Sequence, residues 1–179
     1  MDNSAATRSQ KGSPILQIKD LRTYFDTRDG TVRAVNGVSL EVFSGETLCI
    51  VGESGCGKSV TAMSILRLLR EPPATISGTI LLHLAGGRAP ADLGAIDPTS
   101  REIQELRGSE IAMMFQGPMR ALSPVSTVGP QVAEAFWVLQ KQSRQQAYRE
   151  AVDGLERVGL PEPGRLAGAY PHSLSGGQL

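Results

Sequence analysis

Short apolar runs separated by turn residues dominate the first part of the chain. The run ILQIKDLRTYF predicts a strand, TRDGT predicts a hairpin turn at Asp29-Gly30, and VRAVNGVSLEV predicts one or two further strands. ISGTILLHL predicts a strand pair or hairpin arm. TLCIV at residues 47–51 and EIAMMFQ at residues 110–116 are short and almost uniformly apolar, which is typical of parallel strands buried on both faces.

A helical period appears between these runs and dominates beyond residue 121. Helix faces are predicted in three segments, by Ala62, Ile65, Leu66 and Leu69, by Val132, Ala135, Phe136 and Leu139, and by Tyr148, Ala151, Val152 and Leu155. Pro72-Pro73 is expected to end the first helix, and Gly159 with Pro161 the last.

Two pairs of residues have the spacing of a helix-capping box. Thr99 with Glu102 predicts the start of a short helix that Gly108 closes, and Ser143 with Gln146 predicts the start of a later one. The chain therefore consists of a strand-rich first two-thirds followed by a mostly helical segment.

One loop carries recognisable chemistry. The residues of this loop match the P-loop pattern, with four residues between its first glycine and the Gly-Lys-Ser triplet: Gly52, Glu53, Ser54, Gly55, Cys56, Gly57, Lys58 and Ser59. Glycines allow backbone N–H groups to converge on an anion, and the helix that follows adds the positive end of its dipole. Lys58 would bind the β- and γ-phosphates of a nucleotide, and the Ser59 hydroxyl would join a Mg²⁺ shell. A chance glycine loop is the alternative, but the position between an apolar run and a helix is the one that the motif requires.

Composition narrows the class of protein. The 18 basic and 18 acidic residues balance, so the net charge indicates neither nucleic acid nor an anionic membrane as a partner. No apolar run is long enough to span a bilayer, and residues 1–13 are expected to be a disordered leader, not a signal peptide. Cys49 and Cys56 are expected to be free thiols of a cytosolic chain.

In their order and spacing, GESGCGKS, the glutamine that ends IAMMFQ, and LSGGQ resemble the nucleotide-binding domain of ABC transporters. The longer strings GETLCIVGESGCGKSVTAMSIL, LRGSEIAMMFQGPMRALSP and YPHSLSGGQ are similar to the dipeptide, oligopeptide and nickel importer branch. The resemblance covers about residue 15 to the last residue. It implies an α/β fold: a P-loop NTPase (RecA-like) core with an antiparallel β subdomain and a helical subdomain.

The resemblance assigns ATP and Mg²⁺ as cofactors and gives roles to individual residues. Phe25 corresponds to the aromatic residue that stacks on adenine, with Tyr24 as the alternative. Either ring could instead serve only to pack in the core beneath the hairpin. Val60, directly after the P-loop, is an expected nucleotide contact. Gln116 corresponds to the Q-loop glutamine and is expected to contact the nucleotide as well. Ser59 and Gln116 are the expected metal contacts. Ser175, Gly176, Gly177 and Gln178 correspond to the signature motif, which in the family covers the ATP of a second ATP-binding subunit in a head-to-tail dimer. His172 is expected to be structural.

The same resemblance predicts organisation and partners. The expected parts are the leader 1–13, an ATP-binding core with its β subdomain at 14–120, and a helical subdomain at 121–179, with residues 117–131 as the joint between the last two. The partners would be the second ATP-binding subunit and integral membrane permease subunits, with no nucleic acid, at the cytoplasmic side of the membrane. In the family the joint region meets the permease.

The chain departs from the family pattern in two ways. Gly117 stands where the branch usually has an aspartate. Residues Arg120 to Pro124 (RALSP) stand where the branch has a more polar run. Residues 1–179 also contain no apolar run that ends in the Asp-Glu pair of Walker B, so the C-terminal part of the core, including the catalytic glutamate and the switch histidine, is expected to be missing. We therefore expect an N-terminal fragment that binds ATP weakly at best and does not hydrolyse it at a useful rate alone. Its buried strands would be left with open edges.

The predicted function is the ATP-binding subunit of an importer for peptides or a similar solute. Two alternatives stay open: an ABC ATPase that works without a membrane partner, and an inert nucleotide-binding product of a truncated gene.

Overall fold

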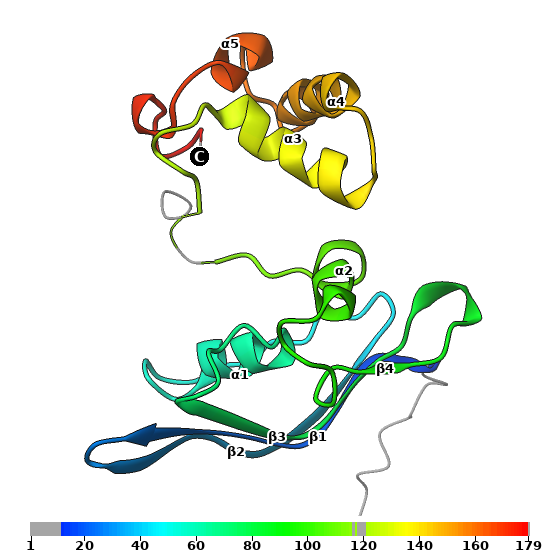
Figure 1. The fold of residues 1–179 in the computed structure, drawn as a ribbon, viewed down its shortest axis with the longest axis vertical. Coiled ribbons are helices and arrows are strands. Elements are labelled where there is room, and N and C mark those ends of the chain that lie inside the picture. The colour runs from blue at the N-terminus through cyan, green and yellow to red at the C-terminus, as the bar shows by residue number, and fades with distance from the viewer. Residues whose placement is uncertain (1–11, 116, 118–120, 179) are drawn as a thin grey trace, which may run out of the picture. The chain divides into compact units, whose positions relative to one another are not determined.

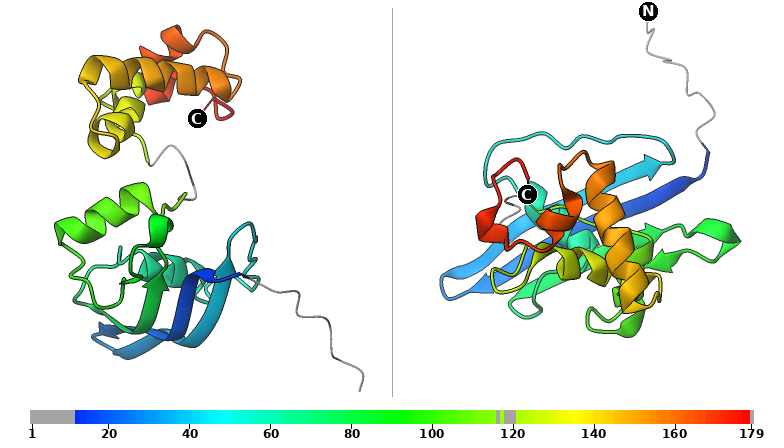
Figure 2. Two further views of the ribbon diagram at one scale, coloured as in Figure 1. Left: turned by 90° about the vertical axis from the view of Figure 1, so that its right-hand side faces the viewer. Right: turned by 90° about the horizontal axis from the view of Figure 1, so that it is seen from above.

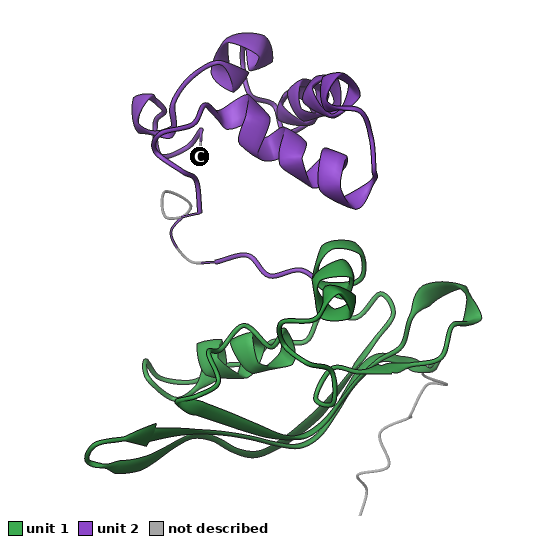
Figure 3. Cartoon of the chain, viewed as in Figure 1, with its two compact units in different colours: residues 1–111 green, residues 112–179 purple. Residues whose placement is uncertain are grey.

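A computed structural model describes residues 12–115, 117 and 121–178 of the chain. The chain forms two compact units, Met1–Ile111 and Ala112–Leu179 (Figure 3). The predicted domain boundary follows residue 120. Residues 118–120 lie outside the described part of the chain, so this boundary stays a prediction.

Unit 1 contains an antiparallel sheet. β1 (Pro14–Thr27) and β2 (Gly30–Phe43) form a long hairpin, which confirms the hairpin turn predicted within TRDGT. The two turn residues are Arg28 and Asp29, and Gly30 is the first residue of β2. β3 (Ala74–Leu82) pairs with the other edge of β1, and the short β4 (Ala91–Asp92) pairs with the free edge of β3 (Figure 1). The strand order is β2-β1-β3-β4, with every pair antiparallel.

Helices α1 (Lys58–Ile65) and α2 (Arg101–Ser109) lie on the same side of this sheet (Figures 1 and 2). A buried hydrogen bond of 2.7 Å joins the hydroxyl groups of Thr23 on β1 and Ser64 on α1. The core of unit 1 consists of apolar side chains from the strands, both helices and the loop before α2: Ile18, Leu21, Val35, Ile65, Leu66, Ala74, Ile80, Leu82, Leu93, Ile103 and Leu106. The segment between β3 and β4 includes a 3-10 turn, η1 (Ala85–Gly87).

The two most apolar runs are not strands, so this part of the prediction was wrong. Residues 47–51 and 111–115 have no regular secondary structure, and Val51 and Met114 are 91% and 97% exposed. A parallel strand buried on both faces needs hydrogen-bonded neighbours and covering layers. Within the described residues, every strand belongs to the antiparallel sheet, and neither run pairs with it.

Helix ends in unit 1 also differ from those expected. α1 stops at Ile65, well before Pro72, and Arg67 beyond it has a positive φ of 53°. α2 is capped by Ser100, whose side chain accepts a hydrogen bond from the Ile103 N–H, not by Thr99. Thr99 donates instead to Asp97, from both its backbone N–H and its hydroxyl. The neighbouring Asp97 carboxylate thus engages Thr99 and leaves Ser100 to cap the helix.

Unit 2 is helical, with α3 (Val128–Leu139), α4 (Arg144–Arg157), α5 (Pro163–Ala167) and the 3-10 turn η3 (Pro171–Ser173) (Figure 2). Its core is built on small residues, since Ala133, Ala147 and Ala151 are buried with Val132 and Phe136 packed against them. The predicted cap of α4 is confirmed, because the Ser143 side chain accepts a hydrogen bond from the Gln146 N–H. Tyr148, expected on the buried stripe, is 38% exposed, and Ala147 takes the buried position.

Candidate functional site

The P-loop wraps around the ammonium group of its own lysine. Residues 52–57 form a loop, and Lys58, Ser59 and Val60 form the first turn of α1. Lys58 Nζ donates to the carbonyl oxygens of Gly52 at 2.7 Å and Glu53 at 2.6 Å, and lies 3.3 Å from Cys56 Sγ. A positive charge is therefore held inside the loop, at the end of α1 where the helix dipole is also positive. The loop suits an anion. On binding, the Lys58 ammonium would leave the two carbonyl oxygens and donate to the anion instead.

Gly57 sets the position of this loop against the sheet. It has a φ of +93°, and a Cβ atom at this position would lie 2.3 Å from the Ala34 carbonyl oxygen on β2. No side chain fits so close an approach, and the left-handed backbone favours glycine as well. The glycine in the Gly-Lys-Ser triplet thus serves the contact between loop and sheet.

The structure brings Phe25 toward the P-loop side of the sheet. β1 pairs without interruption with β3 from Arg22 to Phe25, so strand alternation places Phe25 on the same face as Thr23, the face that α1 covers. Ala34, which Gly57 approaches, lies between the β2 partners of Thr23 and Tyr24. Phe25 is half-buried and follows Tyr24 on β1, so it lies one residue beyond the strand position that Gly57 approaches.

Tyr24 is engaged elsewhere. Its hydroxyl donates to Asn36 Oδ1 at 2.7 Å, and the Arg33 guanidinium lies 5.7 Å from the centre of its ring. By alternation it faces away from α1. Of the two aromatic candidates, the geometry favours Phe25.

The predicted metal contacts are a serine and a glutamine. The Ser59 side chain is exposed at the start of α1, whereas Gln116 lies outside the described residues. In the described part of the chain, His, Cys, Asp and Glu side chains form no group that could hold a metal by themselves. A hydroxyl beside a phosphate-binding loop suits Mg²⁺, which usually keeps most of its shell from phosphates and water.

The signature residues form a turn in unit 2. The Ser175 N–H donates to Gln178 Oε1 at 3.0 Å, and the Gln178 N–H donates to the Ser175 carbonyl at 2.9 Å. This is the side-chain-to-backbone half of a capping box. The rings of Tyr170 and His172 stack just upstream of this turn, with their centroids 5.5 Å apart.

A cluster of charged residues that the sequence does not predict lies just beyond the end of α1. Arg107 on α2 donates to the carbonyl oxygens of Leu66 at 2.7 Å, of Arg67, and of Pro98 at 3.5 Å. Arg67 is 7% exposed and pairs with Glu71 at 3.1 Å. Burial, with the charge of Arg67, lowers the pKa of Arg107. No sequence pattern links an arginine on one helix to carbonyl groups some 40 residues away.

Most of the chain is similar in sequence to known ATP-binding proteins. The family described as ABC transporter matches residues 35–179. A Brucella melitensis protein named as a peptide import ATP-binding protein is 48% identical over 165 residues, which is 92% of this chain and 48% of that protein. The dipeptide transport ATP-binding protein DppD of Bacillus subtilis is 43% identical over 164 residues, 91% of this chain and 47% of its own length. The chain thus spans about half the length of the curated relatives it matches.

The fold is similar to that of solved ATP-binding cassettes. A dimeric post-hydrolysis structure of the cassette MJ0796 with ADP and Pi matches with a TM-score of 0.72 at 24% identity, covering 91% of this chain and 64% of that one. CbiO1 from Clostridium perfringens, part of a cbiONQ complex, matches with a TM-score of 0.62 at 28% identity, covering 93% and 58%. These similarities confirm the predicted α/β P-loop NTPase fold. Together with the family match over residues 35–179, they show that the chain belongs to the ABC transporter family.

Proposed function

We propose that this chain is the N-terminal, nucleotide-binding part of the ATP-binding subunit of an importer for peptides or a similar solute. The observation that carries the proposal is the Lys58 ammonium held inside the P-loop at the start of α1. The names of the relatives, which are peptide and dipeptide transport ATP-binding proteins, support the peptide class of solute.

The residues divide the work of binding ATP. Lys58 and the backbone of residues 52–57 would hold the β- and γ-phosphates, Ser59 and Gln116 would contact Mg²⁺, and Phe25 would stack on adenine. Bound Mg²⁺ would neutralise charge that develops on the phosphates. Ser175 to Gln178 would cover the ATP of a second ATP-binding subunit, because glycines in a turn leave backbone N–H groups open to an anion.

We further propose that the partners are that second subunit and integral membrane permease subunits, at the cytoplasmic side of the membrane. None of the helices that the structure describes has the length and apolar character needed to cross a bilayer.

Equilibrium binding of a fluorescent ATP analogue with Mg²⁺ to the purified chain tests the nucleotide site. Lys58→Met keeps the aliphatic stem and removes the charge, and we expect at least a tenfold loss of affinity, which corresponds to about 1.4 kcal/mol. Lys19→Met is the matched control, because Lys19 is an exposed residue of β1. Equal affinity of the Lys58→Met and Lys19→Met chains would refute the proposed site. We expect no phosphate release from residues 1–179 alone.

A further inference from the structure

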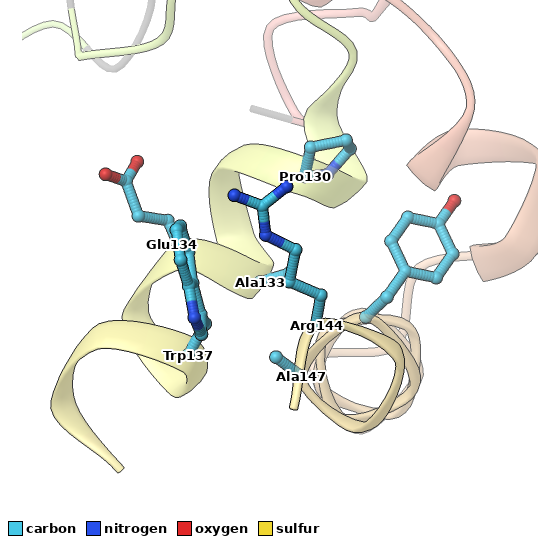
Figure 4. A pocket seen from close by; sticks show the side chains of 7 residues that line it. Pro130, Ala133, Glu134, Trp137, Arg144 and Ala147 are labelled. Carbon is cyan, nitrogen blue, oxygen red and sulfur yellow. The ribbon is translucent and has the colours of Figure 1, made fainter. Parts of the chain in front are cut away.

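A cavity of about 330 Å³ lies between α3 and α4 within unit 2 (Figure 4). Ala133 and Ala147, both buried, form its apolar floor, and Trp137 and Tyr148 add aromatic walls. The volume is at the lower end of the range of small-molecule sites. The cavity therefore has room for a ligand of a few heavy atoms, and every residue that lines it belongs to unit 2.

Two opposite charges line this cavity without pairing with each other. Glu134 belongs to α3, and the side chain of Arg144 reaches from α4 toward α3 (Figure 4). Across the described part of the chain, neither of them makes an ion pair. One acceptor group and one donor group are therefore open to a ligand in the same cavity.

The position of the positive charge favours a carboxylate at the start of α4. The Arg144 guanidinium lies 4.5 Å from the centre of the Trp137 ring, which is a cation–π contact. A guanidinium stacked on an aromatic face keeps the N–H groups of its edge available for an acceptor. Arg144 is also the first residue of α4, directly after the Ser143 cap, so a negative group bound there would lie at the positive end of the helix dipole.

A ligand with a single charge would meet repulsion in this cavity. An anion bound to Arg144 alone would face the Glu134 carboxylate, and a cation bound to Glu134 alone would face the guanidinium. A molecule that carries both an ammonium and a carboxylate group would pair with both side chains. The buried alanines add a preference for an apolar side chain on that molecule.

The Tyr148 wall is held in place by a glycine. A Cβ on Gly129 would lie 2.6 Å from Tyr148 Cε2 and 2.9 Å from the Ala167 carbonyl oxygen. The ring of Tyr148 thus packs directly against the first turn of α3. A wall that is already ordered loses little entropy when a ligand binds.

We propose that this cavity binds a small zwitterion with an apolar side chain, either a free amino acid or a short peptide. The carboxylate of the ligand would accept two hydrogen bonds from Arg144, and its ammonium would donate to Glu134. Its side chain would pack on Ala133 and Ala147. The inference goes beyond the proposed function, because it assigns a second ligand to residues that take no part in the predicted nucleotide site.

The fluorescence of Trp137, the sole tryptophan of the chain, reports on the cavity and tests the proposal. Leucine and the dipeptide Leu-Leu, neither of which absorbs in the near ultraviolet, are titrated into the whole chain without nucleotide. We expect a saturable change, and the ligand that binds more tightly identifies the source as a free amino acid or a peptide. The N-acetyl and amide derivatives of that ligand each lack one charge, and we expect both to bind at least fivefold more weakly.

Two substitutions assign the charges to their partners. Arg144→Gln should remove the preference for the zwitterion over its amide, and Glu134→Gln should remove the preference for the zwitterion over its N-acetyl form. The matched controls are Arg149→Gln and Glu156→Gln, because both residues are exposed on α4 and neither lines the cavity. Both controls should preserve the two preferences.

Three outcomes overturn the proposal. Equal binding of the N-acetyl form would make the cavity an anion site, and equal binding of the amide would make it a cation site. No saturable change with leucine or Leu-Leu would show that the cavity binds no such zwitterion. Lys58→Met must leave the titration unchanged, so a failed nucleotide site and a failed zwitterion site give separate results.

Discussion

Arg107 joins the end of α1, the helix that begins at the P-loop, to α2. Arg107 donates to the carbonyl oxygens of Leu66, the C-cap of α1, and of Arg67, the residue that follows it, so it binds the chain where the helix ends. Arg107→Met removes the guanidinium while it keeps most of the aliphatic stem. The perturbation thus tests whether this capping arginine stabilises unit 1.

The magnitude follows from the contacts. Hydrogen bonds to a charged group contribute about 1.5–3 kcal/mol each, and the third contact, to Pro98 at 3.5 Å, is too long to add much. Burial and the charge of Arg67 lower the pKa of Arg107, so the guanidinium also carries a desolvation and repulsion cost that its removal relieves. We expect a net loss of about 2–4 kcal/mol in the free energy of unfolding.

Urea unfolding followed by far-ultraviolet circular dichroism measures this loss, and hydrogen exchange of the Leu66 amide, which donates to Ala62 O, locates it. The matched control is Arg101→Met in the same helix, because the Arg101 side chain is 85% exposed and its pair with Glu105 is a surface ion pair. That control should cost less than about 0.5 kcal/mol. Arg107→Lys should recover part of the loss, because it restores the charge without the planar fork. A loss with Arg107→Met no larger than with Arg101→Met would refute the reasoning.

Three further substitutions test local features. Gly57→Ala should lower the free energy of unfolding by about 2–4 kcal/mol and weaken ATP binding, because its Cβ would lie 2.3 Å from a β2 carbonyl oxygen at a φ of +93°. Gly154 lies inside α4 with open space around it, so Gly154→Ala should instead raise the free energy of unfolding by about 1 kcal/mol in the same urea assay. Hydrogen bonds from Thr99 lower the pKa of Asp97, so its stabilising effect is present above its ordinary pKa and is lost as the pH falls through the lower value of the folded state. Asp97→Asn should therefore flatten the decrease in urea midpoint below pH 4, and an unchanged acid dependence would count against this assignment.

Features determined by neighbours in the chain could be predicted from the sequence. The hairpin turn within TRDGT, the Ser143 cap and the P-loop at the start of α1 depend on residues a few positions apart, and all three appear as predicted. Backbone conformation and capping are local, so sequence spacing is enough to specify them. The roles of Gln116 and of residues 175–178 stay predictions.

Tertiary contacts decided the rest. The sequence predicts an α1 that continues to Pro72, but Arg107 binds the carbonyl groups of Leu66 and Arg67, and the helix ends at Ile65. The apolar residues 47–51 have the composition of a buried strand, yet a strand exists only with a neighbour to accept its hydrogen bonds, and no described strand pairs with them. The cavity at Trp137 likewise depends on the packing of α3 on α4. The sequence by itself therefore determined the family and the loop that precedes α1, because both depend on short local motifs, and phosphate binding by this loop stays a prediction. Helix ends, strand pairing and cavities required the tertiary structure, because the residues that form them lie far apart along the chain.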